Sequence, residues 1–236
     1  MQRQAFSQAR AAILRSHDGR ASLCQPFITA FGVTGAAVSV LVGPASQTTI
    51  CASDALASRL DELQFDLGEG PCWTALADRA PVLLRDVGSE DATWPAFSHM
   101  VRDEDLPVGG MYAFPLVIGS LEIGAVDLYS SASGDLEPEF VAEASSLADL
   151  TSWQVLRRIL DDHAEPYDGG SLGYARREIH QATGMLIVQL DIGAEDAELL
   201  LRAHAFSSGR TVREVANDIV ERRLDFSSGS LHEGPE

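Results

Sequence analysis

The alternation of hydrophobic and polar positions divides the first two thirds of the chain into short strands and longer helices. The apolar run at residues 36–42 is short, rich in β-branched residues and followed by a Gly-Pro pair, which is typical of a buried strand that ends in a turn. Residues 48–52 are its expected hairpin partner. Residues 113–118 and 121–129 predict a second, central hairpin around a tight Gly-Ser loop.

After the second hairpin, the apolar residues recur with the period of a helix instead of alternating. Pro138 opens a predicted helix that runs to about Leu160, with apolar residues repeating along one face. Strands flanked by helices on both sides in the sequence are typical of an α+β domain. The stretch DHAEPYDGGSLG at residues 162–173 is rich in Pro, Gly and Asp, so it predicts a linker and a domain boundary.

Three amphipathic helices are predicted beyond this linker. In the first, apolar or small residues recur four and three positions apart from Ala175 to Leu190. The second starts at about Ala194 with acidic residues in its first turn, where they suit the helix dipole. The third opens on a capping box formed by Thr211 and Glu214. We therefore expect a small all-α three-helix bundle at the C-terminal end.

The charge is unevenly distributed. The chain has 17 basic and 35 acidic residues, a formal net charge of −18, which argues against non-specific coating of nucleic acid. Residues 172–226, however, hold seven arginines against nine acidic residues and are nearly balanced. An acidic protein can still bind nucleic acid where its few arginines converge.

Cysteine usage and hydropathy suggest a cytoplasmic chain. Cys24, Cys51 and Cys72 are odd in number and share no CxxC spacing, so we expect reduced, buried thiols rather than disulfides or a zinc site. No apolar run reaches the roughly 18 residues needed to cross a bilayer. The polar N-terminus lacks the apolar core of a signal peptide. We expect no membrane association.

The motif LGEGPCW at residues 67–73, the hairpin FPLVIGSLEIGAVDLY and the order of the predicted elements together resemble the GAF domain of bacterial sensory proteins. The likeness covers roughly residues 20–160. It implies a six-stranded antiparallel sheet with helices on one face. On the other face it implies a pocket that in some members holds a cyclic nucleotide, a haem or another small molecule.

No particular ligand is specified by these residues. The sequence has no cyclic-nucleotide signature, and His99, the lone histidine of this region, is more often a surface or core residue than a haem ligand. We therefore expect no known cofactor. A small molecule remains possible in a pocket that we place at Cys72, Trp73, Met111 and Phe114.

The C-terminal helices, with IHQATGMLIVQL at residues 179–190 and LLLRAHAFSSGRTVREVANDIV at 199–220, resemble an ANTAR domain over residues 172–224. A GAF domain followed by ANTAR is an arrangement of actinobacterial antitermination regulators. The resemblance implies binding to paired RNA stem-loops with six-base loops in nascent transcripts. Such binding stabilises an antiterminator over an intrinsic terminator and acts on RNA polymerase indirectly. A homodimer would match a target of two hairpins, and the long helix that ends near Leu160 is its expected interface. Paired carboxylates, a nucleophile elbow and a P-loop are absent from the sequence, so we expect no enzymatic activity.

This resemblance suggests a functional reason for a glycine at position 184. A glycine inside a helix costs about 0.5–1 kcal/mol relative to alanine, and here it would remove a side chain where the helix meets an RNA loop. Unpaired loop bases are the part of RNA that proteins can read. Many family members carry Lys at the position of Thr183, so one cationic contact is missing from this chain. The candidate RNA contacts are His180, Gln181, Thr183, Gly184, Arg202, Phe206, Arg210 and Arg213.

Alternative roles exist for several of these residues. Phe206 either stacks on a base or belongs to the core, and the three arginines either contact phosphates or lie on a solvated face. We place the RNA contact on the first two helices and on the turn into the third, because the third helix is rich in acidic residues.

We therefore expect an α+β, GAF-like antiparallel sheet with flanking helices, followed by an all-α three-helix ANTAR bundle. The expected divisions are an N-terminal extension at 1–19, the GAF-like sensor at 20–162, a linker at 163–171, the ANTAR domain at 172–226 and a disordered tail at 227–236.

Two other functions compete with the antiterminator. A GAF-type thiol-dependent methionine sulfoxide reductase would use a reactive cysteine such as Cys72, but no basic residue lies near Cys72 in the sequence, which favours an inert thiol. A sensor whose helical domain docks DNA or protein is the second alternative. Its third helix offers a poor face for a DNA groove, because acidic residues match the basic ones.

Overall fold

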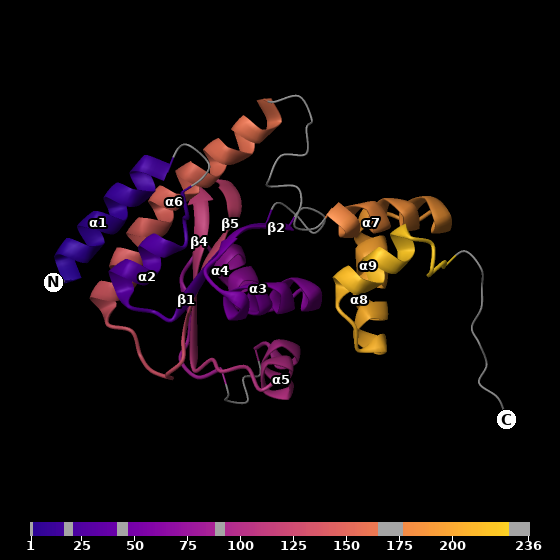
Figure 1. Cartoon of the computed structure of the whole chain (residues 1–236), viewed down its shortest axis with the longest axis horizontal. Helices are drawn as coiled ribbons and strands as arrows, with labels where there is room; N and C mark the ends of the chain where they lie inside the picture. Colours follow the sequence, from indigo (N-terminus) through magenta and orange to yellow (C-terminus); the bar gives the residue numbers. More distant parts are fainter. Residues whose placement is uncertain (1, 17–20, 42–46, 88–92, 165–176, 227–236) are drawn as a thin grey trace. The chain divides into compact units, whose positions relative to one another are not determined.

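The computed structural model describes residues 2–16, 21–41, 47–87, 93–164 and 177–226 (Figure 1). The chain forms two compact units, Met1–Ala175 and Arg176–Glu236. The first holds an antiparallel sheet with flanking helices and the second holds three helices. The expected α+β fold followed by a helical bundle is therefore confirmed.

The sheet of the N-terminal unit has strand order β2-β1-β5-β4-β3, and every described pairing is antiparallel. Its strands are β1 (Gly35–Leu41), β2 (Gln47–Ala52), β3 (Val82–Leu84), β4 (Gly110–Ile118) and β5 (Leu121–Ser130). Both predicted hairpins are confirmed, with β1 paired to β2 and β4 paired to β5. Among the described residues there are five strands, not the six that the GAF resemblance implies.

Three helices, α1 (Gln2–Arg15), α2 (Gln25–Phe31) and α6 (Pro138–Ala164), pack on one face of the sheet (Figure 1). Val38 and Phe114 from the strands are buried there against Ile13 and Leu147. Burial of such side chains contributes about 1.5–3 kcal/mol each. Ile13 lies in the segment predicted to be an extension, so α1 is part of the core of this unit.

The opposite face of the sheet is covered by α3 (Ala55–Leu67), α4 (Pro71–Asp78) and α5 (Pro95–Asp103). Leu60, Phe97 and Met111 are buried on this side. The expectation of helices on one face only was therefore wrong. The reason lies in β4, which is buried at every position from Gly110 to Phe114 and so needs apolar cover on both faces.

Two of the three cysteines form a disulfide, contrary to the expectation of reduced thiols. Cys24, at the N-cap of α2, is bonded to Cys51 of β2 with an S–S distance of 2.09 Å. β2 pairs with β1 and α2 packs against β1, which brings together two cysteines that are 27 residues apart in the sequence. Cysteine spacing alone does not reveal this. Cys72 is a free, buried thiol, as expected.

The C-terminal unit consists of α7 (Arg177–Leu190), α8 (Ala194–Ser208) and α9 (Val212–Val220). Their apolar faces meet in one core that includes Leu186, Leu201 and Ile219. The predicted capping box at the start of α9 is present, and Gly209 ends α8 in a left-handed conformation with φ of 64°.

Some predicted segments lie outside the described residues. These are residues 165–171 of the predicted linker and the predicted tail, 227–236. Among the helices that the structure describes, none is long and apolar enough to cross a membrane.

Candidate functional site

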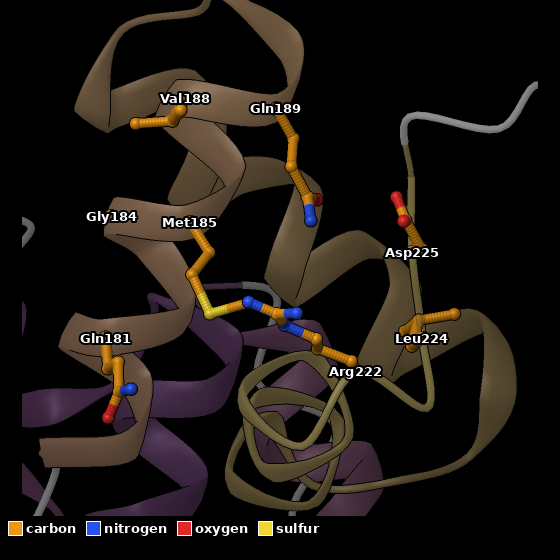
Figure 2. Close-up of a pocket in the computed structure, with 8 residues that line it drawn as sticks. All are labelled: Gln181, Gly184, Met185, Val188, Gln189, Arg222, Leu224 and Asp225. Carbon is orange, nitrogen blue, oxygen red and sulfur yellow. The ribbon is translucent and has the colours of Figure 1, made fainter.

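A cavity of about 490 Å³ lies on the C-terminal unit, between α7 and the chain that follows α9 (Figure 2). This volume falls within the range of about 300–1,000 Å³ that is usual for small-ligand sites. Figure 2 shows Met185 extending from α7 toward the guanidinium of Arg222. The lining residues are Gln181, Gly184, Met185, Val188, Gln189, Arg222, Leu224 and Asp225.

Gly184 lies in the middle of α7 and is exposed at this cavity. A Cβ atom built on it would meet no atom of the described residues within 4 Å. Packing inside the chain therefore does not require glycine here, although glycine in a helix interior costs about 0.5–1 kcal/mol. The consequence is a strip of helix backbone that a ligand can approach closely.

Two polar side chains of the cavity have hydrogen-bonding capacity that the described residues do not use. The Oε1 atom of Gln189 is shielded from solvent and accepts no hydrogen bond there. Arg222 follows α9 in a left-handed backbone conformation with φ of 58°. Among the arginine side chains described in this unit, that of Arg222 is the one without a hydrogen bond or ion pair.

The neighbouring arginines are held by carboxylates. Arg210 and Arg223 each donate to Asp218, at 2.6 Å, and these hydrogen bonds hold the pKa of Asp218 below its usual range. Arg202 lies 4.0 Å from Glu198, whose pKa is raised by burial and lowered less strongly by Arg202. The guanidiniums of Arg210 and Arg223 are therefore already partly satisfied within the chain, whereas Arg202 makes only this long ion pair.

The structure places two of the predicted RNA contacts, Gln181 and Gly184, at the cavity. Thr183, by contrast, is 5% exposed and its hydroxyl donates to the carbonyl of Ile179 at 2.9 Å. The expectation that Thr183 offers its hydroxyl to RNA was therefore wrong, because this side chain points into the bundle. Thr183 is one residue from Gly184, so its side chain points about 100° around the helix from the exposed position of Gly184.

The other predicted contacts lie away from the cavity lining. His180, Arg210 and Arg213 are exposed, and Arg202 is half-buried. Phe206 is 67% exposed, so the alternative that it belongs to the core is wrong.

Gln189 and Arg222 were not predicted as site residues from the sequence. For Gln189 a signal existed, because Gln181, Met185 and Gln189 are spaced four apart and so share one side of a helix. For Arg222 there was none beyond its charge, because its position depends on how the chain turns after α9.

The four residues predicted to line a pocket in the N-terminal unit are not brought together. Cys72 and Trp73 pack together in one cluster, and Met111 lies in another cluster under α3 and α5. Phe114 lies on the opposite face of the sheet, against α1, α2 and α6. Residues an odd number of positions apart in a strand point to opposite faces, which separates Met111 from Phe114.

Cys72 belongs to a buried polar cluster. Its backbone N–H donates to Oε1 of Gln64 at 2.8 Å, and Nε2 of Gln64 donates to Asp127 at 2.6 Å. Burial raises the pKa of the Cys72 thiol well above its usual value, and the nearby Asp127 and Asp61 raise it further. Because the thiolate is the nucleophile, this environment does not favour thiol-based reduction at Cys72.

Comparison with known families identifies both units. The profile of the GAF domain matches residues 4–152, more than half of the chain. The chain belongs to the GAF domain family. The profile of the ANTAR domain matches residues 175–220, so an ANTAR domain follows the GAF domain. No curated protein matches the chain.

Solved GAF structures resemble the N-terminal part. The GAF domain of a phosphoenolpyruvate-protein phosphotransferase from Coxiella burnetii superposes with a TM-score of 0.52 and 12% identity, covering 68% of this chain and 98% of that chain. Free methionine-R-sulfoxide reductase from Neisseria meningitidis has a TM-score of 0.48 and 17% identity, covering 68% of this chain and 92% of that chain. The first likeness supports the GAF fold.

The two domains together define the class of protein. GAF domains are sensory modules, and the ANTAR domain is an RNA-binding module of antitermination regulators. This pair of domains points to a sensor-regulator.

Proposed function

We propose that this protein is a signal-responsive transcription antitermination regulator. Its ANTAR domain binds two adjacent RNA hairpins with six-base loops in a nascent transcript. Binding stabilises the antiterminator at the expense of an intrinsic terminator, so the effect on RNA polymerase is indirect. The site of action is the cytoplasm, where transcription takes place.

Gly184 is the observation that carries this proposal. It lies inside the continuous helix α7 of the ANTAR domain, at a point where packing among the described residues does not require glycine. An exposed glycine beside a cavity allows the backbone to approach a bulky partner closely. Unpaired hairpin bases are such a partner, since they present both an apolar face and hydrogen-bonding edges.

A homodimer would match a target made of two hairpins. Helix α6 supports this part of the proposal, because it exposes two large apolar side chains, Trp153 (56% exposed) and Leu160 (59% exposed). They are seven residues apart and so lie on one side of the helix. A second copy of α6 is the proposed cover for this side.

The GAF domain is the proposed sensor. A small molecule or a protein partner that binds it would change the dimer and, through it, the spacing of the two ANTAR bundles. This coupling is proposed from the domain order, and it requires that the signal bind the two states of the dimer with different affinities.

A titration of the full chain against RNA tests the proposal. The probe carries two adjacent six-base-loop hairpins, and the controls are a single hairpin and duplex DNA, each at two salt concentrations. We expect preference for the double hairpin and loss of binding in Gly184→Arg, which fills the open strip of α7.

Two outcomes of this titration would contradict the proposal. Equal affinity for all three nucleic acids, or no binding at low salt with cell extract present to supply a missing signal, contradicts the antiterminator. A duplex DNA preference would instead favour a DNA-docking helical domain. Sedimentation of Trp153→Glu against the unaltered chain tests the dimer separately.

A further inference from the structure

We propose that the cavity between α7 and the turn after α9 takes one unpaired base of the RNA loop, and that Arg222 hydrogen-bonds to the edge of that base. This inference rests on the proposed function and specifies its binding site. It assigns a recognition role to a residue beyond the stretch that the ANTAR profile matches, which ends at residue 220.

The apolar part of the cavity suits the flat face of a base. Gly184 contributes bare backbone, and Met185 and Val188 follow it on α7. Val188 is 83% exposed. An exposed aliphatic side chain lacks the favourable free energy that burial would contribute. A base laid against this surface would cover Val188 and use the space that Gly184 leaves open.

The polar part of the cavity suits the edge of a base. The guanidinium of Arg222 has five N–H donors in a planar fork, and its fork is unoccupied among the described residues. Gln189 adds an amide whose Oε1 accepts no hydrogen bond there. A base edge carries both acceptors and donors, so it can satisfy both side chains at once.

Charge alone would not select Arg222. Arg223 is its neighbour, and carries the same charge, but it is held by Asp218 and Glu221 and does not line the cavity. A phosphate contact could use either arginine, whereas a contact inside the cavity can use only Arg222. Arg223 is therefore a matched control.

The first experiment compares Arg222→Gln with Arg223→Gln in the full chain, by titration against the double-hairpin RNA. We expect Arg222→Gln to weaken binding by about 5- to 150-fold relative to Arg223→Gln, the range for one lost contact between an arginine and a base. Equal affinities of the two variants would overturn the proposal.

A second experiment replaces each loop nucleotide in turn by an abasic one. One position should be coupled to Arg222, so that the abasic RNA binds the unaltered chain and Arg222→Gln equally well. Independent, multiplicative losses at every loop position would show that Arg222 does not read a base.

Two further variants separate the possible causes of a loss. Arg222→Lys keeps the charge but not the planar fork, so it should fail to restore binding, and full restoration would indicate a phosphate contact and overturn the proposal. Gln189→Leu tests the other side of the cavity without changing charge, and should weaken binding at the same loop position. Helix content and thermal melting of each variant show whether the bundle is folded.

The failure of this inference is distinguishable from failure of the proposed function. If the unaltered chain does not prefer the double hairpin, the proposed function itself is wrong. If it does prefer that RNA and Arg222→Gln behaves like Arg223→Gln, the regulator stands and the cavity is not the base site.

Discussion

Arg210 donates to Asp218 with 2.6 Å between Nη2 and Oδ2, linking the turn before α9 to the last turn of that helix. Asp218 also accepts from Arg223 at 2.6 Å. The residue that the sequence suggests as a phosphate contact therefore already has an anionic partner. RNA would have to compete with Asp218 for both guanidiniums.

Removing this competitor should strengthen RNA binding. In Asp218→Asn, Arg210 and Arg223 lose their shared carboxylate, so Arg210 becomes available to a phosphate, while Arg223 keeps its ion pair with Glu221. We expect tighter binding, with a salt slope that steepens by about 0.7 for each additional phosphate that these arginines neutralise. The measurement is the affinity for the double-hairpin RNA at four or more salt concentrations. An unchanged slope would mean that neither arginine reaches a phosphate.

Gly184→Ala should separate stability from binding. A Cβ at this position meets no atom of the described residues within 4 Å, and alanine is the better helix former, so the variant should be more stable by about 0.5–1 kcal/mol. RNA affinity should fall, because the added methyl group occupies the open strip. Helix melting followed by circular dichroism gives the stability. A variant that is both more stable and fully active would remove the functional reason for this glycine.

Asp127 should make the stability of the GAF domain depend on pH. Burial, and to a smaller extent Asp61, raises the pKa of Asp127 from 3.8 to about 8, so the folded chain holds this proton more tightly than the unfolded chain. Its contribution to stability is full below about pH 4 and is lost as the pH rises through about 8. Over that window the free energy of unfolding should fall by up to about 1.4 kcal/mol per pH unit.

Asp127→Asn provides the control, because an amide keeps the oxygen that accepts from Gln64 and cannot titrate. All three tryptophans lie between residues 73 and 153, so tryptophan fluorescence during urea unfolding reports on this domain alone. If the free energies of unfolding of the two proteins change equally from pH 5 to 8, the pKa of Asp127 is not raised, and the prediction is wrong.

The disulfide should stabilise the GAF domain. Cys24 and Cys51 are 27 residues apart, and a cross-link over such a loop contributes about 2–4 kcal/mol by restricting the unfolded chain. The double variant Cys24→Ala, Cys51→Ala should lose about that much and should no longer respond to a reductant, whereas Cys72→Ala should keep the response.

Thiol counting gives an independent check on this bond. The unaltered chain, denatured without reductant, should show one free thiol, that of Cys72. Three free thiols would contradict the bond between Cys24 and Cys51.

Local sequence patterns predicted many of the helices and strands, but only some of the residues that line the cavity. The capping box of Thr211 and Glu214 was predictable because it depends on residues three apart. Gln181 and Gly184, which the ANTAR resemblance and their positions on one helix suggested as RNA contacts, both line the cavity. Thr183 was misassigned because a sequence does not show which polar residue of a helix turns inward.

The sequence by itself determined the two hairpins, the long helix α6, the three C-terminal helices, the two units and the unusual glycine in α7, because helices, hairpins and caps depend on residues close together in the chain. Only the tertiary structure decided the bond between Cys24 and Cys51, and the second layer of helices on the sheet. It also placed Arg222 across the cavity from Gly184. These features join residues that are distant in the chain, and only packing in three dimensions brings such residues together.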